Sequence, residues 1–143
     1  MKRLLLLLPL CCWLSIVPAA VLDSVMNLWN DTTQHDTSRL NAMRWLIGNK
    51  YIFSKPDSAF YFAQMQYELA EATGQKRYMA NALNIQGISF AIRGMHRKAV
   101  DCYSQSRNIF EELGNKGGVA TAILNMGNIY RQQEDKEKDE SNI

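Results

Sequence analysis

Proline and histidine are scarce in this 143-residue chain, and their scarcity limits the classes of fold and function. The three prolines lie at positions 9, 18 and 56, so no proline interrupts a helix from Asp57 onward. The two histidines, His35 and His96, are far apart, and no set of Cys, His and acidic residues has metal-ligand spacing. Because catalysis needs clustered titratable groups or a bound metal, we expect no enzyme, no metal site and no cofactor.

The chain also lacks a strong excess of charge of either sign. Its formal net charge is +2, and both extra positive charges lie in the N-terminal segment considered next. A nucleic-acid-binding protein would carry a basic stripe with stacking aromatic residues. We therefore expect neither a nucleic-acid partner nor a small-molecule substrate.

The first twenty residues have the three parts of a secretory signal peptide. Two basic residues form a positive start, Leu4–Val17 is apolar, and a helix break at Pro18 precedes two alanines. The apolar run is shorter than the ~20 residues that cross a bilayer as a helix. We expect a cleaved signal over residues 1–20 and an exported protein, periplasmic or secreted. An uncleaved membrane anchor and a lipoprotein signal at Cys11 or Cys12 are the alternatives.

Removal of this segment leaves a single cysteine, Cys102, so no disulfide can form within the chain. A small apolar residue on a helix is the favoured interpretation of Cys102, ahead of a reactive thiol. The fold must then be stabilised by packing.

The rest of the chain repeats at a fixed interval. When the sequence is shifted by 40 positions, Glu71–Lys76 falls on Glu111–Lys116 with a glycine at the same place. Each unit contains two helical patterns separated by a short break. The matched pairs include Ala59 with Ala99, Leu69 with Ile109, Gly74 with Gly114, Ala80 with Ala120, Ala82 with Ala122, Gly87 with Gly127, and Phe90 with Tyr130.

This periodicity predicts a lead segment over 21–37, helical repeats over 38–133 and a charged, disordered tail over 134–143. A short amphipathic stretch at 21–29 is expected to cap the stack. Ser54 is expected to cap the second repeat helix, with Pro56 in its first turn. The other repeat helices are expected over 39–51, 78–93, 98–113 and 118–133.

The spacing of Gly87, Phe90, Ala99 and Tyr103 resembles the tetratricopeptide repeat, and the period of 40 resembles a longer variant common in bacterial proteins. The resemblance implies an all-α fold, an α-α superhelix (solenoid) of about 2.5 helix-turn-helix repeats after an N-terminal signal helix. It also implies a non-catalytic module that binds a protein or peptide.

The order of signal, lead segment and repeats resembles the exported front of larger bacterial signalling proteins. In those proteins a cyclase or histidine kinase output follows the repeats. We therefore expect a sensory or scaffolding region, the N-terminal part of a longer signalling protein. A truncated fragment without independent function and a small exported enzyme are the alternatives.

In helical solenoids the first helices of successive units line a groove, and we expect a partner to bind there. Asparagine amides can bond the backbone of an extended peptide without requiring charge. The alternative interpretation is that these residues are merely solvated positions on the helices and bind no partner. The expected groove residues are Asn41, Arg44, Asn81, Asn84, Ile88, Thr121, Asn125, Asn128 and Arg131.

The third unit lacks the pattern of a second helix, because Glu134 and Asp139 stand where the second unit has Gly94 and Ala99. A helix in that place would normally cover Ile123, Met126, Ile129 and Tyr130. A truncated gene product is one explanation. Self-association, or a partner, at the exposed face of the last helix is the other.

Overall fold

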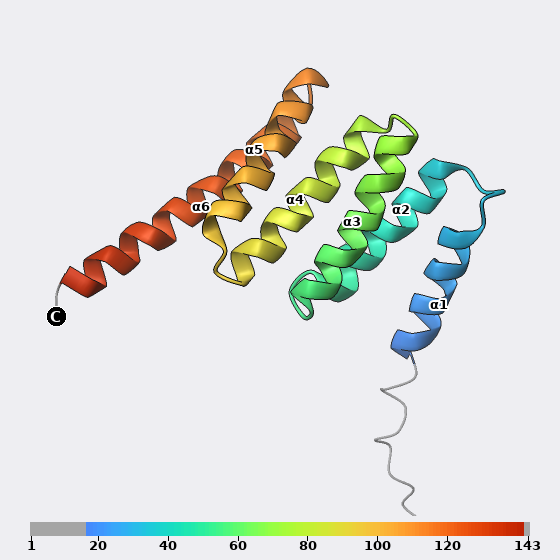
Figure 1. Cartoon of the computed structure of the whole chain (residues 1–143), viewed down its shortest axis with the longest axis horizontal. Helices are drawn as coiled ribbons and strands as arrows, with labels where there is room; N and C mark the ends of the chain where they lie inside the picture. The colour runs from blue at the N-terminus through green and yellow to red at the C-terminus, as the bar shows by residue number, and fades with distance from the viewer. Residues whose placement is uncertain (1–16, 142–143) are drawn as a thin grey trace, which may run out of the picture.

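The structure, a computed structural model, describes residues 17–141, and all regular structure within them is helical. Consecutive helices pack side by side along the chain, so the predicted all-α solenoid is confirmed (Figure 1). None of the described helices is long and apolar enough to cross a membrane. The elements are α1 (Val17–Asn30), α2 (Asp36–Leu46), the π-helical segment η2 (Ile47–Tyr51), α3 (Pro56–Ala72), α4 (Lys76–Ile92), α5 (His96–Glu112) and α6 (Lys116–Ser141).

The turns that follow α3, α4 and α5 have the same structure and set the spacing of the repeat helices. Helices α3, α4 and α5 each have 17 residues. The turns after them contain Gly74, Gly94 and Gly114, with φ of 68°, 72° and 64°, a region that other residues rarely adopt. Next to Gly74, the Gln75 amide donates to the Ala70 carbonyl at 2.7 Å, and equivalent bonds follow the other two glycines. The turn glycines therefore end each helix after the same number of residues.

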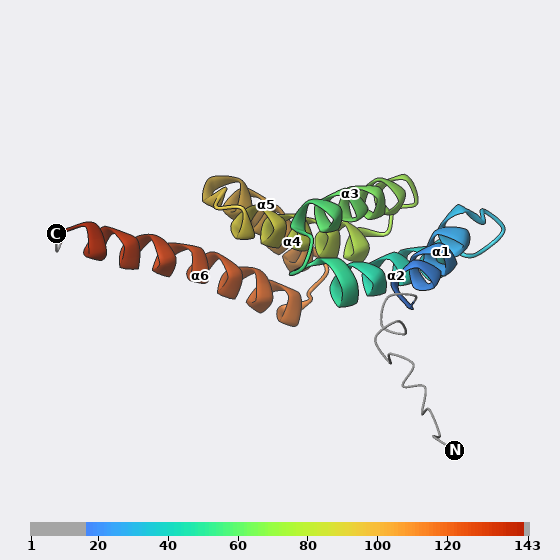
Figure 2. The same ribbon diagram turned by 90° about the horizontal axis from the view of Figure 1, so that it is seen from below.

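The helices form two layers, with α3 and α5 on one side and α2 and α6 on the other (Figure 2). Two buried hydrogen bonds, one from α3 to α2 and one from α5 to α4, join neighbouring helices at equivalent positions. Gln66 Nε2 donates to the Leu40 carbonyl at 2.9 Å, and Ser106 Oγ donates to the Ala80 carbonyl at 2.8 Å. The two donors stand one repeat period apart in the sequence, as do the two acceptors, so the sequence period is also a period of contacts.

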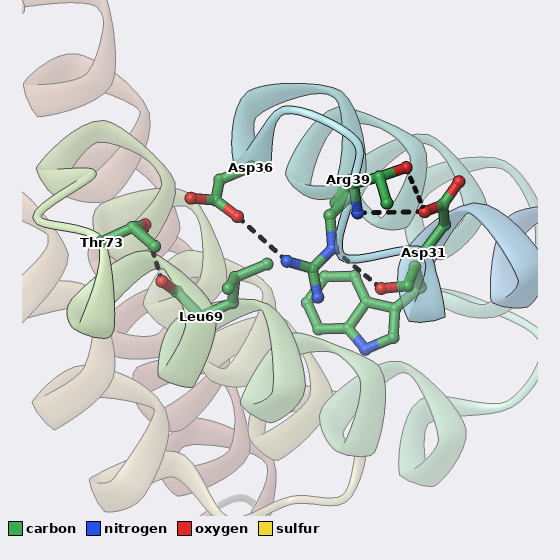
Figure 3. A network of polar contacts seen from close by, with 7 residues as sticks. Asp31, Asp36, Arg39, Leu69 and Thr73 are labelled. Carbon is green, nitrogen blue, oxygen red and sulfur yellow. Dashed lines mark hydrogen bonds and ion pairs between the residues drawn. The ribbon is translucent and has the colours of Figure 1, made fainter.

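The first helix packs on the start of the repeats, as the expected capping segment would. Trp29 of α1 is buried in the larger core cluster with residues of α2 and α3. Arg39 of α2 donates from Nε to the Trp29 carbonyl at 2.8 Å and from Nη1 to Asp36 at 3.0 Å (Figure 3). Its guanidinium also lies 5.5 Å from the centre of the Trp29 ring. Arg39 therefore holds α1 to the first repeat helix through several contacts at once.

Asp31 fixes the turn between α1 and α2 (Figure 3). Its Oδ1 accepts from the Thr33 amide at 3.0 Å and from Thr33 Oγ1 at 2.6 Å, while its Oδ2 accepts from Gln34 at 3.0 Å. The hydrogen bond from the Thr33 hydroxyl is the main cause that lowers the pKa of Asp31.

Several expected helix boundaries were wrong. The first repeat helix begins at Asp36, inside the predicted lead segment, and ends in a π-helical turn. Ser54 is not the cap of α3; its Oγ donates to the Lys50 carbonyl at 2.5 Å, and Lys55 holds the cap position. Helices α4, α5 and α6 begin two residues earlier than expected, because only one residue separates each turn glycine from the next helix.

Residues 1–16 of the expected signal lie outside the described residues. The remainder of the expected signal, 17–20, belongs to α1, and Pro18 lies near its start, where proline is tolerated. The helix that Pro18 is expected to break lies among residues outside the described part of the chain, and within that part α1 runs across the expected cleavage position.

The expected disordered tail is helical as far as Ser141, because α6 is 26 residues long. Glu134 stands one repeat period after Gly94, and glutamate favours continuing a helix where glycine ends one. Lys138 pairs with Glu134 at 2.7 Å and Lys136 with Glu140 at 3.8 Å, both across one helical turn. The prediction of disorder failed because it weighed charge and not helix propensity.

Candidate partner-binding surfaces

The first helices of the repeats, α2, α4 and α6, each present one stripe of residues at helical spacing. We call these stripes together the first-helix face. Its members are Asn41 and Arg44 on α2, Asn81, Asn84 and Ile88 on α4, and Thr121, Leu124, Asn128 and Arg131 on α6.

Asn125, predicted as a groove residue, has a different place. Its Nδ2 donates to Asn84 Oδ1 at 2.9 Å, and both side chains are half-buried. The bond joins α4 directly to α6, so Asn125 lies between two helices and does not simply face solvent. The residue 40 positions after Asn84 is Leu124, whose exposed fraction is 68%. Strict use of the repeat period would have selected Leu124, which the sequence reasoning missed.

The other predicted groove residues differ in how accessible they are. Asn41 and Arg44 on α2 are exposed, as are the α6 members Thr121, Asn128 and Arg131. Asn81 and Ile88 are half-buried, and Ile88 packs against both core clusters. Trp45, beside Arg44, is a second exposed apolar residue that the sequence reasoning left out. The face is therefore most accessible on α6 and contains more apolar surface than predicted.

Helix α6 has a second candidate surface on another side. Ile123 and Tyr130 are 51% and 56% exposed, and a Cβ added at Gly127 would meet nothing within 4 Å. Ile129, by contrast, is buried and Met126 is half-buried against the cluster formed with α5, so of the four residues expected to need a covering helix only Ile123 and Tyr130 are exposed. The uncovered surface is narrower than predicted. We call it the outer stripe of α6, formed by Ala120, Ile123, Gly127 and Tyr130.

Titratable groups are not gathered into a reactive site in the part of the chain that the structure describes. No three His, Cys, Asp or Glu residues of that part are placed to hold a metal ion. Cys102 is buried, and burial, with a smaller contribution from Asp101, raises the pKa of its thiol. The thiol therefore stays neutral at physiological pH and contributes packing, as the favoured interpretation of Cys102 predicts.

Comparison with known proteins identifies the repeats. A family model described as tetratricopeptide repeat matches residues 78–138, which cover α4, α5 and most of α6. Residues 78–138 are therefore similar to the tetratricopeptide repeat. The resemblance read from Gly87, Phe90, Ala99 and Tyr103 is confirmed, because all four lie within the matched residues. Searches of curated proteins and of solved structures find no match. Tetratricopeptide repeats generally mediate contacts between proteins and typically serve as non-enzymatic scaffolds.

Proposed function

We propose that this tetratricopeptide-repeat protein is an exported, non-catalytic module that binds an extended segment of a partner protein on its first-helix face. The observation that supports the proposal is that equivalent positions of α2, α4 and α6, one repeat period apart, carry amide side chains and exposed side chains such as Arg44, Leu124 and Asn128. Such a face can recognise a peptide backbone without a requirement for charge, which suits a chain with little net charge.

The Asn84–Asn125 bond leaves part of both amides for a partner. It uses the oxygen of Asn84 and one N–H of Asn125, so the Asn84 amide nitrogen and the Asn125 oxygen remain to pair with backbone groups. Each such bond adds about 0.5–1.5 kcal/mol. Full burial of Leu124 adds about 1.5–3 kcal/mol. We therefore assign the larger share of affinity to Leu124 and the alignment of the partner to the amides.

Export and a sensory or scaffolding role in bacterial signalling form the finer part of the proposal. Export is supported by the basic, apolar and small-residue order of residues 1–20. The signalling role is supported by the resemblance of this segment order to bacterial signalling proteins. Expression in a bacterial host, with the intact mass of the product measured after cell fractionation, tests export. A periplasmic product shortened by about twenty residues is expected, and a full-length cytoplasmic product contradicts it.

Site-specific photo-crosslinking tests the first-helix face. A photoreactive amino acid replaces Leu124 in the native cells, and Gln105, exposed on α5, serves as the matched control position. Adducts with a partner protein are expected from position 124 and not from position 105. Equal adducts at both positions, or none at position 124, contradict the assignment.

A double substitution extends this test to the amides. Asn84→Ala with Asn125→Ala should lower the adduct yield while the helical circular dichroism signal is kept. Because the double variant also loses an internal hydrogen bond, Ser106→Ala is the control, since it removes a helix–helix bond away from the face. An unchanged yield in the asparagine variant, or an equal loss with Ser106→Ala, rejects the role of the amides.

A further inference from the structure

The outer stripe of α6 repeats a surface that is covered elsewhere in the same chain. On α4 the equivalent positions pack against α5: Ser106 bonds the Ala80 carbonyl, and a Cβ at Gly87 would lie 2.5 Å from the Tyr103 ring. Forty positions further along the chain, Ala120 and Gly127 are exposed and no helix lies over them in the described chain. The contacts of α5 on α4 therefore show what fits the outer stripe, namely a helix that packs closely at the glycine.

Gly127 itself indicates a close approach. Glycine inside a helix is less stable than alanine, so it is retained where the space beside it is needed. Gly87 leaves space for Tyr103 and Gly118 leaves space for the Phe110 ring. A Cβ at Gly127 would meet nothing within 4 Å in the described chain. Gly127 therefore leaves space in which a contact from outside these residues could pack closely.

The described part of α6 does not turn back over the outer stripe. Glu134 replaces the turn glycine, and the helix continues to Ser141, so the residues after the stripe are carried away from it (Figure 2). We propose that the occupant is the α6 helix of a second copy of this chain, packed antiparallel about a two-fold axis at Gly127.

The outer stripe is complementary to itself in this arrangement. Ile123 lies four residues before Gly127 and Tyr130 three residues after it. In an antiparallel pair that crosses at Gly127, Ile123 of each copy therefore packs beside Tyr130 of the other, and the two glycines allow a close approach. The centre of the contact is then apolar on both copies.

Charges at the ends of the helix fit the same arrangement. Within the chain, Lys76 at the start of α4 pairs with Glu112 at the far end of the antiparallel α5, at 2.8 Å. Lys116 occupies the position of Lys76 on α6, at the rim of an apolar hollow of about 410 Å³. In the two-fold pair, Lys116 of one copy comes level with Glu137 and Lys138 of the other. Lys138 pairs with Glu134 of its own helix at 2.7 Å, so Glu137 is the partner that the proposal gives to Lys116, in two equivalent ion pairs that define the antiparallel direction.

Sedimentation velocity of the purified chain over a range of concentrations tests the dimer. A single pair of helices is a small interface, so we expect a reversible monomer–dimer equilibrium. Ile123→Asp should raise the dissociation constant by about tenfold or more, because it buries unpaired carboxylates. Leu124→Asp is the matched control: it changes an equally large exposed residue on the first-helix face and should leave the dimer intact. A monomer at every concentration, or an equal effect of both variants, overturns the proposal.

Two further variants separate the dimer from simple misfolding. Gly127→Ala should raise the thermal unfolding midpoint of the monomer and yet weaken the dimer, which a folding defect cannot do. Lys116→Glu should weaken the dimer, and the combination Lys116→Glu with Glu137→Lys should restore it. Failure of the restored pair to dimerise overturns the antiparallel register. Loss of the dimer leaves the first-helix face unchanged, so crosslinking from Leu124 reports on the proposed function separately.

Discussion

Helices α4 and α6 have the same repeat pattern but different surroundings. Helix α4 packs extensively against both α3 and α5, whereas α6 packs against α5 and makes few contacts with α4, among them the Asn84–Asn125 bond. Leu83 on α4 is 6% exposed and its equivalent Ile123 on α6 is 51% exposed. The comparison shows that a repeat pattern fixes which residues form a stripe, while the following helix decides whether that stripe is buried.

Substitutions that remove side-chain volume should give the largest difference in stability between equivalent positions of α4 and α6. Leu83→Ala should lower the free energy of unfolding by about 2–5 kcal/mol, because it leaves a cavity at a buried position of α4. Ile123→Ala should lower it by no more than about 0.5 kcal/mol, since the side chain is half exposed. Chemical denaturation at low protein concentration, where monomers prevail, measures both. Similar losses of unfolding free energy for the two variants would show that the outer stripe of α6 is covered in the monomer.

Addition of a methyl group should change stability in opposite directions on the two helices. Gly87→Ala forces the Tyr103 ring to move and should cost about 1–3 kcal/mol. Gly127→Ala meets no neighbour in the described chain and should stabilise the monomer by about 0.8–1 kcal/mol through helix propensity. Thermal unfolding at low concentration gives the sign, and a shift of both variants in one direction would contradict the comparison.

Insertion of the missing turn glycine should shorten α6 toward the length of α4. Glu134→Gly should cost about 1 kcal/mol of local helix stability and speed hydrogen exchange of the amides after position 134. Glu134→Ala is the control, because it removes the 2.7 Å contact with Lys138 but keeps helix propensity. Equal hydrogen-exchange rates in both variants would show that the Glu134–Lys138 ion pair, and not helix propensity, continues α6 beyond position 134.

The smallest effect at neutral pH concerns Tyr103, which fills the space beside Gly87 on α4 and has no counterpart over Gly127 in the described chain. Burial raises the pKa of Tyr103 to about 12, with a smaller contribution from Cys102. An unfolded tyrosine titrates near ~10, so the unfolded state loses its proton first and the free energy of unfolding falls as the pH rises from about 10 to about 12. Tyr103→Phe should remove this fall and change stability at pH 7 by less than about 1 kcal/mol. If the free energy of unfolding of the variant still falls between about pH 10 and about pH 12, other groups cause the fall.

Much of this fold could be predicted from the sequence because glycine and alanine residues recur at equivalent positions of the repeat. Gly74, Gly94 and Gly114 mark turns, and Gly87 marks a close contact, so their spacing alone defines the order of helices. Helix starts were misplaced because the turns use a single residue after each glycine. The extent of α6 was missed because its end depends on the balance between helix propensity and charge, which a repeat pattern does not report.

The candidate site was predicted less completely than the fold. The repeat period located the stripes on α2, α4 and α6, but the choice of Asn125 over Leu124 followed residue type and not register. The Asn84–Asn125 bond joins α4 and α6 at positions one step out of the period. Such a contact follows from how two neighbouring helices cross, which the sequence period does not contain.

The equal lengths of α3, α4 and α5 have a consequence for how such a gene can change. Each of these helices, with the turn that follows it, occupies half of the repeat period, so two of them form one complete unit. Duplication or loss of one unit by unequal recombination would leave each remaining junction with the same helix on either side of it. The number of units can therefore change in a single genetic event without new contacts having to evolve. The first helix of the final unit then presents the same stripe of residues, whatever the number of units before it.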